Sequence, residues 1–216
     1  MEKEKTLLYL IRHGESQANK RDAFLGHCDL PLTDQGIAQA ELAAAYLKDI
    51  GADAIYSSDL TRAHETAKRT AALLDLPIQT DPNLREIDCG LWDNLTFTEL
   101  RQRFAESFAV WTDDISAAVC DGGESVAQLA QRIMGILTSI ARANAGKKIL
   151  VFSHGTPIRI AGCVAMGRPL SELKEVPWAA NASTTTLEYE NGSFRLVEYG
   201  REDYMGALVT KLPDHV

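Results

Sequence analysis

Two short segments of the chain place a histidine and a glycine directly after an apolar run. Arg12-His13-Gly14 follows the run at residues 7–11, and Ser153-His154-Gly155 follows the run at residues 149–152. Histidine changes its charge near neutral pH, which suits it to a reaction centre. One histidine after a strand is usually an ordinary loop residue. Two such turns in one chain make a shared site the better interpretation.

Arg62 is the third unusual residue, because it falls in the first turn of a helix predicted over residues 60–74. A cation there faces the positive end of the helix dipole, which is unfavourable by roughly a few tenths of a kcal/mol. A bound anion would reverse that sign, since free N–H groups and a guanidinium group both favour phosphate. In open α/β sheets, ligands bind at the carboxyl ends of the strands. We therefore expect both His-Gly turns, Arg12 and Arg62 to meet in one crevice.

The elements that hold these residues alternate between strands and helices along the chain. Continuous apolar runs at residues 7–11 and 149–152 are typical of strands buried on both faces of a parallel sheet. Further strands are predicted at residues 54–57, 78–80, 184–189 and 194–199, and Asn191-Gly192 indicates that the last two form an antiparallel hairpin. The pattern predicts an α/β fold, a three-layer sandwich with a largely parallel central sheet, an antiparallel edge and helices on both faces.

Apolar residues at helical spacing predict the main helices. One helix follows Thr33, a residue suited to the N-cap, a second spans residues 60–74, and a third follows Ser125, with Gln128 three residues on as in a capping box. A fourth helix is expected to begin at Pro157, because proline suits the first helical position. We interpret residues 1–216 as one domain with a cover, or lid, inserted at about residues 87–124.

The composition excludes several classes of protein. The 216 residues carry a net charge of −8 and a pI of about 5.1, whereas nucleic-acid-binding proteins present a basic face. The longest early apolar run has five residues, far too few to span a membrane. The four cysteines form no C-x-x-C pair, so we expect reduced thiols, a cytoplasmic protein and no metal site. His64-Glu65 stops short of a zinc-protease motif, because Lys68 replaces the second histidine.

The segment Arg12-His13-Gly14-Glu15-Ser16 resembles the R-H-G-E-[ST] signature of the histidine phosphatase superfamily, which includes the cofactor-dependent phosphoglycerate mutases. The resemblance covers nearly the whole chain in order. It continues through Asn19, Phe24-Leu25-Gly26, Asp29-Leu30-Pro31-Leu32-Thr33, Tyr56-Ser57-Ser58-Asp59-Leu60-Thr61-Arg62-Ala63, Leu84-Arg85-Glu86, Gly90-Leu91-Trp92, Gly122-Gly123-Glu124-Ser125 and Ser153-His154-Gly155.

This resemblance implies a role for each site residue. His13 is expected to be the nucleophile that accepts the phosphoryl group, with Arg12, Arg62 and His154 around the phosphoryl oxygens. Glu86 occupies the position of the family's general acid, and Asp88 is the reserve acid. Asn19, the backbone around Gly26, and Gly155 are further candidates for contacts with substrate oxygens. The chemistry implied requires neither a metal nor a cofactor, because two arginines and a histidine supply the positive field.

The lid separates the branches of the family. Residues 87–121 hold two cations against seven acidic side chains, a net charge of −5. A phosphoglycerate mutase must hold a second phosphate and a carboxylate, and the family uses a longer, cation-bearing insertion for this purpose, so the short acidic lid favours a phosphatase. Five apolar residues recur at helical spacing in it, and any that faced the crevice would favour an apolar or aromatic leaving group: Phe97, Leu100, Phe104, Phe108 and Trp111.

Three positions depart from the family pattern. Leu25 replaces a common glutamine, Asn94 stands where glycine is common, and Tyr204 stands where many relatives have a histidine. Asparagine tolerates left-handed backbone geometry, so the change at residue 94 is mild. The changes at Leu25 and Tyr204 bear on substrate specificity rather than on the phosphoryl-transfer chemistry.

The sequence thus predicts a cytoplasmic, metal-independent phosphatase whose partner is a small phosphate monoester, with a phosphohistidine intermediate. A sugar phosphate, a nucleotide-like ester and α-ribazole phosphate all fit, as does broad specificity. The enzyme alternative is a cofactor-dependent phosphoglycerate mutase. The other alternative is a non-catalytic module that binds a phosphorylated ligand.

Overall fold

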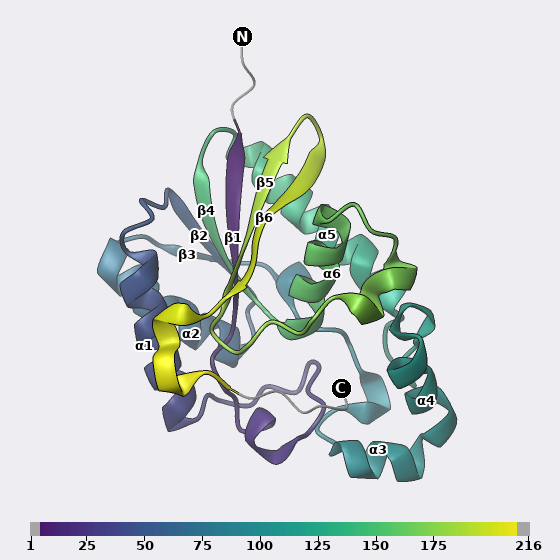
Figure 1. Ribbon diagram of the computed structural model, residues 1–216. Coiled ribbons are helices and arrows are strands. Elements are labelled where there is room, and N and C mark those ends of the chain that lie inside the picture. The colour runs from purple at the N-terminus through teal and green to yellow at the C-terminus, as the bar shows by residue number, and fades with distance from the viewer. Residues whose placement is uncertain (1–4, 211–216) are drawn as a thin grey trace.

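The computed structural model describes residues 5–210, and a six-stranded sheet in the order β3-β2-β4-β1-β5-β6 forms its centre (Figure 1). The strands are β1 (Thr6–Arg12), β2 (Ala54–Ser57), β3 (Ile78–Thr80), β4 (Lys148–Ser153), β5 (Thr184–Glu190) and β6 (Ser193–Arg201). Strands β1 to β4 pair in parallel, whereas β5 is antiparallel to β1 and β6. The predicted α/β fold, with a mostly parallel sheet and an antiparallel edge, is confirmed.

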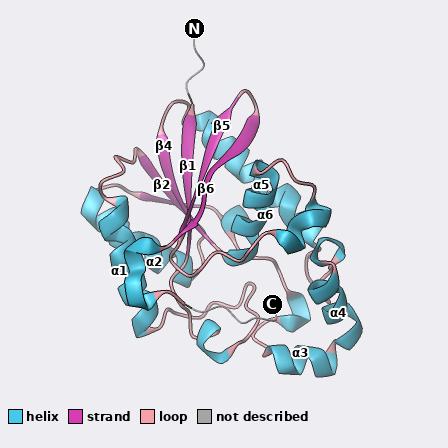
Figure 2. Ribbon diagram, viewed as in Figure 1, coloured by secondary structure: helices cyan, strands magenta, loops and turns pink. Residues whose placement is uncertain are grey.

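Helices cover both faces of the sheet (Figure 2). Alternate residues of β1 point to opposite faces, so Leu8 and Leu10 join the apolar cluster under α5 (Val126–Ala143) and α6 (Gly155–Ala165). Ile11 joins the cluster under α1 (Asp34–Leu47) and α2 (Thr61–Leu74). Alternate residues of β4 join the same two clusters. Burial on both faces is the reason for its continuous apolar sequence.

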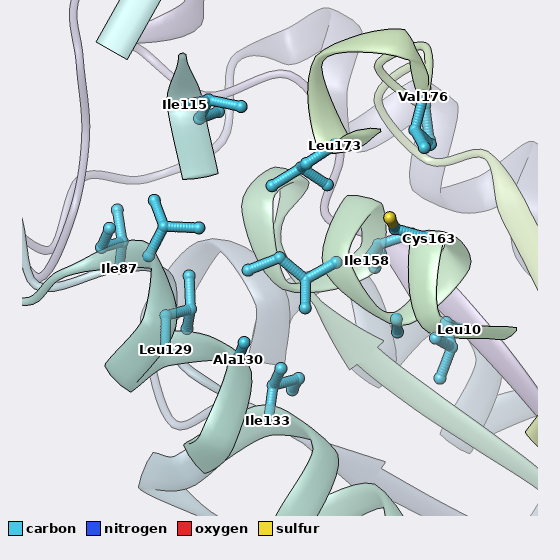
Figure 3. Close-up of a cluster of buried hydrophobic side chains, with 14 of the residues drawn as sticks. Leu10, Ile87, Ile115, Leu129, Ala130, Ile133, Ile158, Cys163, Leu173 and Val176 are labelled. Carbon is cyan, nitrogen blue, oxygen red and sulfur yellow. The ribbon is translucent and has the colours of Figure 1, made fainter. Parts of the chain in front are cut away.

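The core between the sheet and α5 and α6 is a continuous apolar cluster (Figure 3). Leu129 and Ile133 of α5 lie there with Ile158 of α6. The predicted capping box is present at the N-terminus of α5: the Ser125 hydroxyl accepts the Gln128 N–H, and the Gln128 side chain accepts the Ser125 N–H. This reciprocal pair fixes the residue at which the helix begins, shortly after Gly122-Gly123.

Helix α6 begins earlier than the sequence predicts. His154 is its N-cap and Gly155 its first residue, so Pro157 is the third residue of the helix. Proline is tolerated there because the first four N–H groups of a helix have no partner within it. As a result, the second His-Gly turn belongs to the start of the helix itself. The Thr33 cap of α1 is confirmed.

The lid contains two short helices, α3 (Phe97–Arg103) and α4 (Ala105–Asp113), which lie beyond the carboxyl ends of the parallel strands (Figure 1). Phe104 separates them, with φ and ψ of −133° and 41°. Phe97, Phe108 and Trp111 are buried and continue the apolar cluster of α5 and α6. The lid is therefore packed onto the body of the protein.

Among residues 5–210, no helix combines the length and the apolar character that crossing a bilayer requires.

Candidate active site

The ends of β1, β2 and β4 bring the two His-Gly turns together. Arg12 lies opposite Ser153 in the parallel ladder, and the His13 N–H donates to Ser153 O at 3.1 Å. The imidazole rings of His13 and His154 consequently lie with their centroids 5.2 Å apart at 60°. The sheet register, which this backbone hydrogen bond extends past the end of β1, sets the spacing of the rings.

His13 is held in one tautomer. Its Nδ1 lies 2.7 Å from Gly14 O, and because a carbonyl only accepts, Nδ1 carries the proton and Nε2 keeps its lone pair. The residue is 5% exposed. Burial lowers the pKa of His13 well below 6.5, and the charges of Arg62 and Arg12 lower it further. The ring is therefore neutral at pH 7.

His154 is fully buried, and its Nε2 lies 2.9 Å from the hydroxyl of Ser58, the first residue after β2. Burial also lowers the pKa of His154, followed by the charge of Arg62. Its Nδ1 is buried without a hydrogen-bond partner among residues 5–210. A buried polar atom of this kind costs about 1–3 kcal/mol unless a ligand pairs with it.

Two guanidinium groups lie beside the histidines without a carboxylate partner. Arg12 is 7% exposed and Arg62 is 0% exposed, and neither forms an ion pair with any residue that the structure describes. Burial lowers the pKa of Arg12 to about 10 and also lowers that of Arg62, although nearby Glu86 opposes both shifts. Both remain charged at pH 7. A buried charge without a partner is strongly unfavourable, so this site is built to receive an anion.

Backbone carbonyls hold both guanidinium groups. Arg12 Nη1 donates to Ala179 O at 2.6 Å, and Arg62 donates through Nη1 to Cys28 O at 3.1 Å and through Nη2 to Gly26 O at 2.7 Å. The Nε group of each arginine is buried without a partner in the described part of the chain. Each arginine is thus fixed by some of its donors, while its Nε group lacks a partner within residues 5–210.

Glu86 lies at the N-terminus of α6. Its carboxylate oxygens accept the N–H of Ile87 at 2.8 Å and the N–H of Thr156 at 3.2 Å. It lines the same pocket as Arg12 and His13, whereas Arg62 and His154 lie outside that lining. Asp88, the reserve candidate, is absent from that lining and accepts the Gly90 N–H in its own turn.

The structure distributes the other sequence candidates differently. Asn19 lines the pocket, but its Oδ1 accepts from Ser16 and Asn181, so only its amide NH2 remains for a ligand. Gly155 lines the pocket against the Arg12 guanidinium. Gly26 does not line it: its N–H donates to Asp93 and its carbonyl holds Arg62. In this structure Gly26 supports Arg62, and a contact with substrate oxygens stays a prediction.

Sequence reasoning missed several residues of the pocket wall. Trp178 and Asn181 reach the pocket from the segment before β5, and the Asn181 amide donates to His13 O at 3.0 Å. Because β5 runs antiparallel to β1, its beginning lies at the edge where β1 ends. A prediction that residues 184–189 pair antiparallel with β1 would have located these pocket residues. The hairpin pattern alone does not predict that pairing.

The outer wall of the pocket is apolar. Phe24, Phe97 and Trp111 line it, with Leu25 beside them. Among residues 5–210, Arg12 is the one Lys or Arg in the lining, whereas Arg101 and Arg103 of the lid lie over Phe108 and Phe104. Within residues 5–210, no three His, Cys, Asp or Glu side chains gather in a group that could hold a metal ion.

Two of the three departures from the family pattern have clear structural settings. Asn94 adopts a left-handed backbone with φ of 64°, as its tolerance predicts. Tyr204 stacks on Tyr46 and donates to Ala182 O at 2.5 Å, outside the pocket lining.

Comparison with known proteins places this site in a family. The chain is 32% identical to "Phosphoserine phosphatase 1" of Hydrogenobacter thermophilus over 85% of its length and 86% of the relative. It is 33% identical to "Adenosylcobalamin/alpha-ribazole phosphatase" of Escherichia coli, covering 75% of this chain and 80% of the relative. It is also 33% identical to "Probable phosphoglycerate mutase GpmB" of Yersinia pestis, covering 93% and 88%.

A solved structure agrees. YhfR of Bacillus stearothermophilus superposes with a TM-score of 0.89 at 30% identity, covering 93% of this chain and 99% of that one. The model of the "Histidine phosphatase superfamily (branch 1)" matches residues 8–202, from the first strand to the end of the last. The chain that buries two unpaired arginines beside two histidines is therefore an enzyme of the histidine phosphatase superfamily, branch 1.

Proposed function

We propose that this enzyme hydrolyses small phosphate monoesters with uncharged, ring-bearing leaving groups through a phosphohistidine at His13. The observation that carries the proposal is the pair of buried guanidinium groups, Arg12 and Arg62, which have no carboxylate partner within residues 5–210 and lie beside a neutral histidine. A phosphate monoester would supply the missing negative charge. A cytoplasmic location remains part of the proposal.

In the first half of the reaction, His13 Nε2 attacks phosphorus. The P–O bond to the leaving group breaks, and its electron pair stays on the leaving oxygen, which takes a proton from the Glu86 carboxyl. Arg12, Arg62 and His154 stabilise the charge on the phosphoryl oxygens during transfer. The Nδ1–H bond to Gly14 O keeps the ring oriented and stabilises the positive charge that it gains.

In the second half, water attacks the phosphohistidine. Glu86, now a carboxylate, removes the water proton as the P–N bond breaks, so inorganic phosphate leaves and His13 returns to its neutral form. Each Glu86 oxygen accepts one backbone N–H and retains capacity for a further hydrogen bond or a proton. One carboxyl group can thus serve as acid and then as base.

The pocket wall supports the choice of leaving group. Phe24, Phe97 and Trp111 offer apolar surface, and the described part of the chain contributes no second Lys or Arg to the lining for another phosphate or carboxylate. The acidic lid adds repulsion to any second anion. These features favour aryl phosphates or α-ribazole phosphate over phosphoglycerates, although a probable mutase is among the relatives.

Phosphate release from α-naphthyl phosphate in EDTA tests the proposal. We expect turnover by the wild type, and a loss of about 10³-fold or more for His13→Ala, since removal of a nucleophile cripples covalent catalysis. His64→Ala, a half-buried residue of α2 outside the pocket lining, is the matched control. An acid-labile phosphoenzyme should form with the wild type and not with His13→Ala.

Two outcomes would contradict the proposal. Undiminished turnover by His13→Ala would exclude a phosphohistidine at that residue. Interconversion of the two phosphoglycerate isomers faster than phosphate release would make the mutase the correct assignment.

A further inference from the structure

Arg132 of α5 connects that helix to the loop that carries Glu86. Nε and Nη2 donate to the two carboxylate oxygens of Glu124 at 2.8 and 2.7 Å. Nη1 donates to Asn83 O and Arg85 O at 2.9 and 3.0 Å, and Nη2 also donates to Glu86 O at 3.0 Å. A guanidinium group has five N–H donors in a rigid fork. All five are used, which is far more than a surface ion pair requires.

Glu124 extends the same contact to the far side of Glu86. Its carboxylate accepts the Asp88 N–H at 2.9 Å, and its own N–H donates to Asp88 O at 2.7 Å. The preceding Gly123 permits this approach, because a Cβ there would lie 2.1 Å from Asp88 O. Backbone groups on both sides of Glu86 are therefore fixed to one ion pair.

The Glu86 side chain points the other way, to the start of α6. Its oxygens accept the Ile87 and Thr156 N–H groups, while its carbonyl accepts Arg132. The loop is thus held between α5 and α6, with the carboxyl group in the pocket lining. Neither Arg132 nor Glu124 belongs to that lining, and both bond to backbone groups around Glu86 rather than to its carboxyl group. Displacing a reacting group by about 1 Å can cost about 100-fold in rate.

We propose that Arg132 and Glu124 are positioning residues for proton transfer by Glu86. The inference rests on the proposed function, in which Glu86 protonates the leaving oxygen. Misplacing the carboxyl group should slow the esters that depend on this proton and spare those that do not. A nitrophenolate leaves readily as an anion, whereas an alkoxide must be protonated as it leaves.

Two esters of similar shape, para-nitrophenyl phosphate and benzyl phosphate, separate these cases. For Arg132→Met we expect kcat/KM, which reports only the steps up to phosphoryl transfer to His13, to fall about 10–100-fold with benzyl phosphate and less than about 3-fold with para-nitrophenyl phosphate, because general acid catalysis contributes about 10²–10⁴-fold. Glu86→Gln should show the same selectivity with a larger loss. Inhibition by inorganic phosphate should keep its constant in Arg132→Met, since the phosphate site is untouched. Arg142→Met, which removes an arginine of the same helix that bonds Tyr189, is the control.

The result that overturns the inference is an equal loss on both esters, or no loss on either, in the Arg132 variants while Glu86→Gln stays selective. Equal loss on both esters in Glu86→Gln would instead refute the role of Glu86, and the inference with it. If Arg132→Met does not fold, Arg132→Lys and Glu124→Gln can be compared on the two esters in the same way, because each removes only some of the hydrogen bonds of Arg132 and Glu124.

Discussion

The buried, neutral histidines make the stability of the fold depend on pH. His13 and His154 have pKa values lowered chiefly by burial, whereas in the unfolded chain each titrates near 6.5. Between the folded value and 6.5, the unfolded state binds a proton that the folded state does not. The free energy of unfolding therefore falls as pH falls through this window and is fully retained above it.

The size of the effect follows from proton linkage. While both rings stay neutral in the folded protein, lowering the pH from about 7.5 to about 5.5 costs about 1.4 kcal/mol per histidine, or about 2.7 kcal/mol for the pair. That is a large share of a typical stability of about 5–15 kcal/mol. Urea unfolding at the two pH values, in buffer without phosphate, measures it.

The comparison of variants isolates the two rings. The double variant His13→Asn/His154→Asn should lose about 2.7 kcal/mol less than the wild type over the same pH interval. Each single variant should recover about half of that difference. Ile55→Val, a core change in β2 that alters no titrating group, should lower stability by about 1 kcal/mol and keep the wild-type pH dependence. Equal losses in the wild type and the double variant would refute the reasoning.

Two further predictions concern the pocket. In Gly26→Ala, the added Cβ would lie 2.4 Å from Cys89 Sγ and 2.6 Å from Ile87 O, so the loop whose carbonyl holds Arg62 must move. We expect the free energy of unfolding to fall by about 1–3 kcal/mol in thermal unfolding. We also expect phosphate to bind more weakly, as measured by calorimetry. Wild-type phosphate affinity in this variant would exclude a supporting role for Gly26. In Trp111→Leu, the loss of aromatic surface should lower kcat/KM for α-naphthyl phosphate about 10-fold and leave kcat/KM for glycerol phosphate nearly unchanged. An equal loss on both esters would show that Trp111 only supports the lid.

Local chemistry explains which elements could be predicted from the sequence. Residues 149–152 of β4 are all apolar because both faces of the strand are buried, and Ser125 caps the start of α5 because the cap uses side chains three residues apart. Both signals lie within a few consecutive residues. The start of α6 was wrong by two residues because the His154 backbone, without a side-chain hydrogen bond, forms the cap.

The rest of the site depends on contacts between distant segments. Asn181 reaches His13 only because β5 pairs with β1, and no short motif near residue 181 encodes that pairing. Gly26 belongs to a recognisable motif, but the sequence does not show that its carbonyl holds Arg62 or that Cys89 and Ile87 fill the space around it. The break between α3 and α4 at Phe104 could not be predicted either, because apolar residues recur at helical spacing on both sides of it.

The position of β1 in the sheet also constrains how the protein is made. Leu8 lies opposite Ile149 on one side and Leu187 on the other, so β1 pairs only with segments that are synthesised much later. Until residues 184–190 emerge, this apolar strand lacks a neighbour on at least one edge and is exposed to aggregation. Such long-range pairing slows folding. A chain released before Thr184 would contain His13, His154, Arg12 and Arg62, yet β1 would be an open edge of its sheet.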